Sequence, residues 1–328
     1  MKEKLISVII PTYNRANSIA EAILSVKNQT YPHVQIIVID DGSSDKTAEI
    51  VGAFAGVEYY YQENKGQGAA RNAGLIFAKG EYLASLDSDD IWQPDFLTKA
   101  TECLEKHSLD FVFLNWISLN GKESFLDYWE RVNVWRRYIN EQDGDWFLID
   151  SENLRRIFLA ACPTPSSSLL LRRSSMVNWN EEIIVADDWL LLLEIVVAKP
   201  CRAAFTLSPH WLKRVFGDNI YDGRDILQVS ENNVRDDCLM ADCLYSRLGF
   251  AEKFIFRRRR TYNHLNYVYF NLKQKNFNKK VLHSMVSAFT LAPFGVYRYL
   301  AEIISGYVKK RLKLMPPEKI RTMKDFVE

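Results

Sequence analysis

Short apolar runs alternate with amphipathic segments over the first ninety residues, and this alternation is the strongest constraint on the fold. The runs are rich in β-branched and aromatic residues, and three of the four end at Pro or Asp, which predicts buried strands. We expect strands at 6–10, 35–39, 57–61 and 82–86, with helices between them. Strands separated by helices of this length indicate βαβ units. The sequence therefore predicts an α/β fold with a mostly parallel central sheet flanked by helices.

Acidic clusters follow two of the predicted strands. Asp40-Asp41 comes after the second strand, and Asp87-Ser88-Asp89 follows the fourth. In an open α/β sheet, ligands bind beyond the carboxyl ends of the strands. We therefore expect the two clusters to meet at one end of the sheet, although Asp41 and Asp87 are 46 positions apart.

Each acidic cluster taken alone is ambiguous. Alternate carboxylates at Asp87 and Asp89 suit Mn²⁺ or Mg²⁺ shared with a diphosphate, but acidic triplets are also common in turns before helices. A carboxylate of Asp40-Asp41 could accept a hydrogen bond from a base or a ribose, or the segment could be a tight turn with a helix cap.

A glycine-rich segment, Gly66 to Arg71, begins like a dinucleotide-binding fingerprint. It follows the third strand rather than the first, and Arg71 replaces the third glycine, so we do not expect a Rossmann cofactor site. Lys65 and Arg71 lie close to the acidic clusters in the predicted fold and could offset diphosphate charge. A solvated loop lysine is the alternative for Lys65.

The joint pattern resembles the inverting glycosyltransferase family 2, which has the glycosyltransferase A-type, Rossmann-like fold. Order and spacing match over about the first 95 residues. The segments that carry the resemblance are Ser7–Asn14, Ser25–Tyr31, Ile39–Asp45, Asn64–Gly66, Ala70–Gly74, Gly80–Leu83 and Leu86–Pro94.

The resemblance implies a role for each matching residue. Pro11, Thr12 and Tyr13 would line the base pocket, Asp41 would read the base, usually uracil, and Asp89 would hold Mn²⁺ or Mg²⁺ on the diphosphate. The positions expected to bind the donor are Pro11, Thr12, Tyr13, Asp41, Lys65, Arg71, Asp87 and Ser88.

The second half of the chain resembles the family more loosely. Pro165–Arg173 is similar to its second strand, and Asp187-Asp188 to the acidic pair whose second member acts as general base. The resemblance thus implies that Asp188 is catalytic, since an acceptor hydroxyl needs a carboxylate to take its proton. The alternative is a pair of acids favoured by the dipole at a helix N-terminus.

The sequence departs from the family pattern at two positions. Asp187 stands where Glu is usual, and Phe216 where many members have His, which puts any metal or diphosphate contact there in doubt. His210 is nearby, but we expect it to be packed or at the surface rather than a ligand.

These features together predict a non-processive inverting glycosyltransferase that moves a sugar from a nucleotide-diphosphate donor, a UDP-sugar, to a hydroxyl of a surface glycan or glycolipid. The Gln-x-x-Arg-Trp signature of processive synthases and any long apolar span are absent from the sequence. The rival hypothesis is a catalytically lapsed sugar-nucleotide-binding or scaffold protein. We expect a cytoplasmic location, with peripheral contact at the inner face of the plasma membrane as an option.

The charge is split along the chain. Residues 251–328 contain 17 Lys/Arg and 5 Asp/Glu, whereas the preceding part contains 25 and 36. We expect a catalytic domain at 1–220, with a donor half at about 1–110 and an acceptor half at about 111–220, and a basic helical extension at 221–328. Helices are predicted at 232–248, 252–272 and 277–291.

The basic extension has three open interpretations. A helix at 295–314 with Lys309, Lys310, Arg311 and Lys313 beside an apolar face could lie on an anionic membrane, pack on the catalytic domain, or form a homodimer contact. The run Arg257–Arg260 lacks stacking motifs, so we do not expect nucleic acid as a partner.

Overall fold

The chain divides into two compact units. A computed structural model describes residues 4–119, 124, 126–127, 130, 135–214, 225–297 and 299–301. The first unit, which we call the sheet unit, comprises Met1–Phe158 and Cys162–Gly217, and the second, the helical unit, comprises Leu159–Ala161 and Asp218–Glu328. The division falls close to the boundary at residue 220 expected from the sequence.

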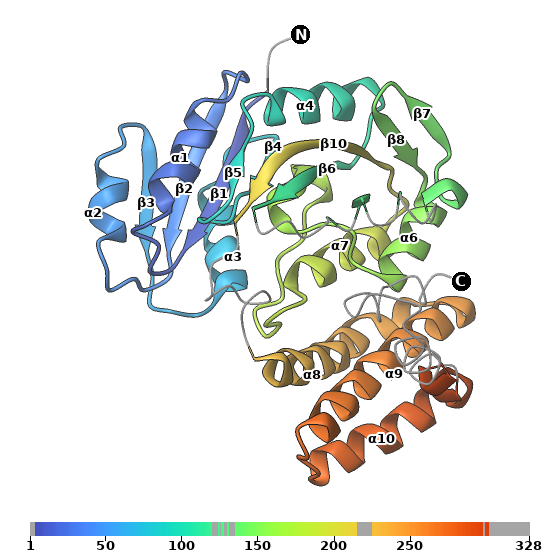
Figure 1. Cartoon of the computed structure of the whole chain (residues 1–328). Helices are drawn as coiled ribbons and strands as arrows, with labels where there is room; N and C mark the ends of the chain where they lie inside the picture. The colour runs from blue at the N-terminus through green and yellow to red at the C-terminus, as the bar shows by residue number, and fades with distance from the viewer. Residues whose placement is uncertain are drawn as a thin grey trace, which may run out of the picture. The chain divides into compact units, whose positions relative to one another are not determined.

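One ten-stranded sheet forms the centre of the sheet unit (Figure 1), in the order β3-β2-β1-β4-β9-β6-β10-β8-β7, with β5 paired to β10. Its strands are β1 (Ile6–Thr12), β2 (Val34–Asp40), β3 (Val57–Tyr61), β4 (Tyr82–Ser85), β5 (Ile91–Trp92), β6 (Phe111–Ser118), β7 (Glu141–Asp143), β8 (Trp146–Ile149), β9 (Leu169–Arg172) and β10 (Ala203–Lys213).

The sheet is parallel in its first half and mixed in its second. Strands β1 to β4 pair in parallel, as the βαβ pattern predicted. Strand β9 then runs antiparallel between β4 and β6, and the β7–β8 hairpin adds antiparallel neighbours to β10. The α/β class with flanking helices is confirmed.

Helices cover both faces of the parallel half. The side chains of β1 alternate, so Ile6, Val8 and Ile10 pack with α1 (Ile19–Lys27) and α4 (Phe96–Lys106), while Ile9 faces the opposite side. There Ile9 packs in a cluster with Ala70 of α3 (Gln67–Phe77). The sheet unit also contains α2 (Thr47–Gly52), α6 (Ser151–Ala160) and α7 (Asp187–Ala198).

Three helices build the described part of the helical unit: α8 (Ile226–Leu244), α9 (Phe250–Lys273) and α10 (Lys279–Leu291). Helix α9 packs against both α8 and α10 (Figure 1). A buried ion pair joins the first two helices, with Arg259 Nη2 2.5 Å from Asp237 Oδ1. The predicted helical C-terminal extension is confirmed.

The arginine run of the helical unit lies along α9 and contacts the rest of that unit. Besides Arg259, the guanidinium groups of Arg257 and Arg260 lie over the ring of Tyr245, at 5.9 and 6.0 Å from its centroid. No helix in the described ranges is both long and apolar enough to cross a bilayer. Lys309, Lys310, Arg311 and Lys313 lie outside the described residues, as does Phe216.

Close approach of α3 to β1 requires a glycine at position 74. A Cβ there would lie 2.4 Å from Cγ2 of Ile9. We expect Gly74→Ala to lower the free energy of unfolding by about 1–3 kcal/mol, because Ile9 is buried and cannot move aside. Urea denaturation followed by circular dichroism measures this.

Gly52→Ala is the matched control, since a Cβ at this helical position meets nothing within 4 Å. It should leave stability unchanged or raise it by up to about 1 kcal/mol. Equal stabilities of the two variants would contradict the close approach.

Candidate active site

A buried arginine joins Asp87, which follows β4, to Asp187, which begins α7. Arg71 on α3 is 1% exposed. Its Nη1 donates to Asp187 Oδ2 at 2.6 Å, its Nη2 to Asp87 Oδ1 at 2.7 Å, and its Nε to Ser85 Oγ at 3.2 Å. Burial alone would lower the pKa of Arg71, but the charges of Asp187 and Asp87 outweigh it and raise that pKa. One guanidinium thus joins the end of β4 to the start of α7, a contact that the sequence analysis did not predict.

All three nitrogens of Arg71 therefore donate to oxygens of the protein. The side chain also lies beneath an aromatic ring, with its Cζ 5.8 Å from the ring centroid of Trp179. These contacts give Arg71 a positioning role toward the acids. Direct contact between Arg71 and the donor stays a prediction.

Asp41 holds the loop that precedes α3. Its Oδ1 accepts hydrogen bonds from Gln62 Nε2 at 2.7 Å and the Lys65 amide at 2.9 Å, and its Oδ2 accepts one from the Gly66 amide at 2.8 Å. Gly66 has φ of 93°, in the left-handed region that favours glycine, which turns its amide toward the carboxylate. Asp41 is thereby fixed beside Thr12, whose carbonyl accepts the Asp41 amide at 2.8 Å.

The cluster Asp87, Asp89 and Asp90 could hold a divalent cation. Oxygen atoms from these carboxylates lie within 4.8 Å of one another. Burial, and to a smaller extent the charge of Asp87, raises the pKa of Asp89 to about 6. The same two causes raise the pKa of Asp90. Crowded, partly desolvated carboxylates gain from a cation, and oxygen donors are what Mg²⁺ and Mn²⁺ prefer. The residues present therefore fit a divalent metal.

Two arginines that the sequence analysis did not single out lie at the same cluster. Arg15, in the turn after β1, places Nε 3.7 Å from Asp89 Oδ2. Arg214, after β10, donates from Nε to the Asp89 carbonyl at 2.5 Å and forms an ion pair with Glu21 of α1. Both positions fall inside or beside segments with family resemblance, but their partners are distant in sequence, so no local signal identifies them.

A serine turn, Ser166–Ser168, connects the acidic turn after β4 to the start of α7. Ser166 donates to both oxygens of Asp188, from its amide to Oδ2 at 3.0 Å and from its hydroxyl to Oδ1. Ser167 donates to Asp90 Oδ2 at 2.7 Å and accepts the Asp87 amide at 3.1 Å. The sequence marked this segment only as the start of a strand, so the roles of its hydroxyl groups were missed.

The two acids at the start of α7 have different surroundings. Asp187 is fully buried and bonded to Arg71 and to Gln67 Nε2, the latter at 2.9 Å. Asp188 is half-buried and bonded to Ser166, a neutral partner. Burial, opposed by the charge of Arg71 and reinforced by that of Asp87, raises the pKa of Asp188. Asp188 is thus the member of the pair that could accept a proton at the surface.

The other predicted donor residues lie around this edge. Pro11 and Thr12 end β1 and are buried, and the Thr12 hydroxyl makes no hydrogen bond with the described residues. Tyr13 and Lys65 are exposed, whereas Ser88 is buried within the acidic turn.

His210, which we did not expect to be a ligand, contacts other parts of the protein. Its Nδ1 lies 3.2 Å from Asp95 Oδ1, at the start of α4. Its carbonyl accepts the amide of Gln93 at 2.9 Å. His210 is thus partly packed against neighbouring segments, and the expectation that it is not a ligand stays a prediction.

Comparison with known proteins supports the family resemblance. Residues 7–161, just under half of the chain, match the profile of the family described as glycosyl transferase family 2. The match includes the segments whose motifs predicted this family.

Curated relatives resemble the first part of the chain. Glycosyltransferase GlyG of Streptococcus pneumoniae is 34% identical over 156 residues, which cover 44% of this chain and 52% of that protein. The putative teichuronic acid biosynthesis glycosyltransferase TuaG of Bacillus subtilis is 40% identical over 114 residues, covering 33% of this chain and 45% of that protein. The chain spans about half or less of the length of these relatives.

Solved structures share the fold. S. aureus TarS residues 1–349, in complex with UDP-GlcNAc, has a TM-score of 0.63 at 19% identity and covers 88% of this chain and 82% of its own. The mannosyltransferase PcManGT from Pyrobaculum calidifontis, in complex with GDP-Man and Mn²⁺, has a TM-score of 0.57 at 17% identity and covers 100% of this chain and 86% of its own. At these identities the likeness establishes the fold alone.

The Arg71 network yields a stability prediction. We expect Arg71→Leu to lower the free energy of unfolding by about 3–5 kcal/mol, because it leaves Asp187 buried without its counter-charge. Urea denaturation of the purified chain measures the loss.

A second substitution tests the cause of that loss. Adding Asp187→Leu to Arg71→Leu should recover part of the stability, since the unpaired buried carboxylate is then also removed. If the double variant is no more stable than Arg71→Leu alone, the ion pair is not what the guanidinium contributes.

Proposed function

We propose that this chain is a metal-dependent, inverting and non-processive glycosyltransferase that transfers a sugar from a UDP-sugar to a hydroxyl of a surface glycan or glycolipid. The observation that carries the proposal is the pairing of two sites across Arg71. Arg71 bonds on one side to Asp87 of a carboxylate cluster suited to a cation, and on the other to Asp187, whose neighbour Asp188 would accept the proton.

The donor would be held at the carboxyl edge of the parallel strands. Asp89 is proposed as the metal ligand, with Asp87 beside it and Ser88 between them. A divalent cation there would offset the negative charge of the diphosphate leaving group. Pro11, Thr12 and Tyr13 would line the base pocket, and Lys65 would add positive charge near the diphosphate.

The acceptor would be activated by Asp188. A sugar hydroxyl is a poor nucleophile until a positioned carboxylate removes its proton. Ser166 donates to both oxygens of Asp188 and so fixes the direction of the carboxylate. Ser166 carries no charge, and burial raises the pKa of Asp188. A base acting opposite the leaving diphosphate supports a single displacement, which inverts the anomeric carbon.

The hydrogen bonds of Asp41 support uracil as the base. A carboxylate has about four acceptor positions. Three are used by Gln62, Lys65 and Gly66, so one remains. The Watson–Crick edge of uracil carries one hydrogen-bond donor, an N–H group, whereas that edge of guanine carries two donor groups. The fit therefore favours a UDP-sugar over a GDP-sugar.

The acceptor class rests on relatives rather than on the site. The name of TuaG places that protein in teichuronic acid biosynthesis, which supports a surface glycan or glycolipid as the acceptor here. Peripheral attachment at the inner face of the plasma membrane would suit such an acceptor.

The rival is a sugar-nucleotide-binding protein that no longer catalyses transfer. The decisive experiment incubates the chain with a panel of UDP- and GDP-sugars, with and without Mn²⁺, and measures nucleotide release. An active enzyme releases UDP in a Mn²⁺-dependent way from one donor. Tight donor binding without any release would instead support the rival.

The first functional prediction concerns the metal. Asp89→Asn should abolish Mn²⁺-dependent donor binding, measured by calorimetry, while the thermal midpoint changes little. The amide keeps the shape of the carboxylate but loses its charge. Asp145→Asn, an exposed acid in the β7–β8 turn, is the control and should bind as wild type. Equal donor affinity of Asp89→Asn and wild type would remove Asp89 as ligand.

The second functional prediction concerns the base. Asp188→Asn should keep donor binding but lose transfer by about 10²-fold or more. In the wild type, kcat/KM should fall as the pH drops through a pKa above the ordinary value of Asp, because only the ionised carboxylate accepts a proton and its pKa is raised.

The pH profile provides the control for that assignment. The acid limb of the profile should disappear in Asp188→Asn. Asp187→Asn should act differently and destabilise the fold, because Asp187 is the buried partner of Arg71. A normal turnover number in Asp188→Asn would place the base elsewhere.

A further inference from the structure

Helix α10 presents a row of apolar side chains to solvent. Leu282, Val286 and Phe289 are 52%, 55% and 51% exposed. Their spacing of four and three residues places them on one side of the helix, and we call them the apolar stripe. The buried face of the same helix is formed by Val281, Ser284 and Ala288. Helix α10 thus has apolar residues both toward its own unit and away from it.

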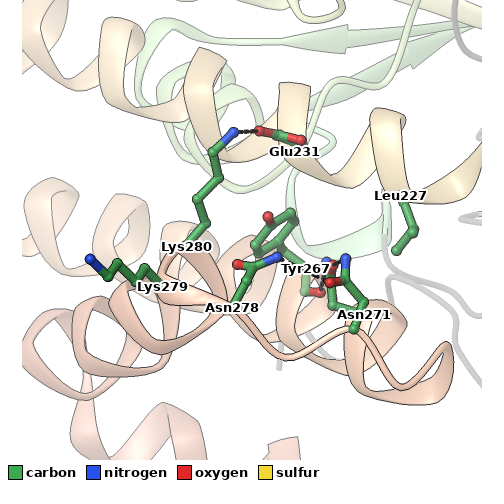
Figure 2. A pocket seen from close by; sticks show the side chains of 8 residues that line it. Leu227, Glu231, Tyr267, Asn271, Asn278, Lys279 and Lys280 are labelled. Carbon is green, nitrogen blue, oxygen red and sulfur yellow. Dashed lines mark hydrogen bonds and ion pairs between the residues drawn. The ribbon is translucent and has the colours of Figure 1, made fainter.

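The packing of α10 fixes the direction of the apolar stripe. A groove of about 470 Å³ separates the start of α10 from α8 and α9 (Figure 2). Across it, Lys280 pairs with Glu231 of α8 at 2.6 Å, and the side chain of Asn278 caps α10 through the Val281 amide at 3.1 Å. The amides of Asn271 and Asn276 bond to each other. Of these contacts, the Lys280–Glu231 pair joins α10 to α8.

Apolar exposure continues beyond the end of α10. Val296 and Tyr299 pack inward with Leu265 and Ala288, whereas Phe294 is 90% exposed and Tyr297 is also exposed. Exposed apolar groups gathered on one element, rather than scattered singly, indicate an interaction surface. Phe and Tyr side chains are typical of surfaces that enter the boundary between water and lipid.

Lysines accompany the apolar stripe. Lys279 lies at the start of α10, and in Figure 2 its ammonium points away from the groove and from Glu231. Lys273 ends α9 and Lys275 lies in the turn that follows, and both are exposed. Residues 251–328 as a whole contain 17 Lys/Arg and 5 Asp/Glu. A two-fold dimer through this surface would bring the same cationic patch of both copies together, whereas an anionic surface would be complementary.

We propose that the apolar stripe and its neighbouring lysines form a docking surface for an anionic lipid bilayer. The apolar side chains would enter the headgroup boundary while Lys273, Lys275 and Lys279 contact lipid phosphates. This surface lies within the helical unit and uses no donor-site residue, so it stands or fails independently of the proposed activity.

The test is co-sedimentation of the full chain with vesicles. Vesicles of phosphatidylglycerol and phosphatidylcholine should sediment the chain at low salt, and pure phosphatidylcholine vesicles should bind it at least about tenfold more weakly. The variant Leu282→Gln/Phe289→Gln should lose about tenfold or more of the partition coefficient, as expected when two apolar side chains no longer leave water. Glutamine keeps helix propensity, so circular dichroism and the thermal midpoint should show an intact fold.

Two further variants test whether vesicle binding depends on the apolar stripe in particular and on the neighbouring lysines. Leu24→Gln/Ile76→Gln replaces two exposed apolar residues on helices of the sheet unit and should bind vesicles as wild type. Lys273→Gln/Lys275→Gln/Lys279→Gln should weaken binding, by about fivefold for each lysine that contacts the surface, and should remove most of the salt dependence.

Several results would overturn the proposal. One is equal sedimentation of wild type and the stripe variant, and another is wild-type binding that does not depend on anionic lipid. A third is a lack of vesicle binding together with a dimer, seen by sedimentation velocity, that the stripe variant dissociates. That last result would assign the surface to a second copy of the chain.

Discussion

The candidate active site depends on one buried guanidinium. Arg71 is 1% exposed, and removing a charge from water is costly unless partners surround it. Its partners are Asp87, which follows β4, and Asp187, which begins α7. Those two segments are a hundred positions apart in the sequence. The burial of Arg71 therefore requires that the end of β4 and the start of α7 lie close together at the sheet edge.

Around Arg71, the partners of each carboxylate decide what it can do. Asp187 pairs with the guanidinium of Arg71, and this buried ion pair gives Asp187 a structural role. Asp188, its neighbour, is held by the amide and hydroxyl of Ser166, which orient it without neutralising it. Asp89 is crowded by Asp87, so its pKa is raised to about 6 and a cation would relieve the repulsion. Three aspartates therefore differ in the role that their surroundings allow: Asp187 an ion pair, Asp188 the acceptance of a proton, and Asp89 the binding of a metal ion.

Periodicity and local motifs predicted much of this arrangement. The strands and helices of the first hundred residues follow from apolar runs that end at turn residues, and the acids at strand ends follow from the polarity of a parallel sheet. The antiparallel placement of β9 and the hydroxyl contacts of Ser166 and Ser167 could not be predicted, because they depend on pairing between segments distant in sequence. Arg71 shows the same limit. Its position was recognised, but its inward contacts with Asp187 and Ser85 appear only in three dimensions.

The helical unit shows why charge in a sequence is not charge on a surface. The run Arg257–Arg260 suggests a polyanion-binding patch, yet Arg259 is buried against Asp237, and Arg257 and Arg260 lie over Tyr245. Arginine suits such positions because its planar group stacks on rings and pairs with carboxylates. Lysine is more strongly hydrated and stays in water. Among the described residues, the capacity of this unit to attract anions therefore rests more on exposed lysines, such as Lys279 beside the apolar stripe, than on the arginine run that dominates the sequence.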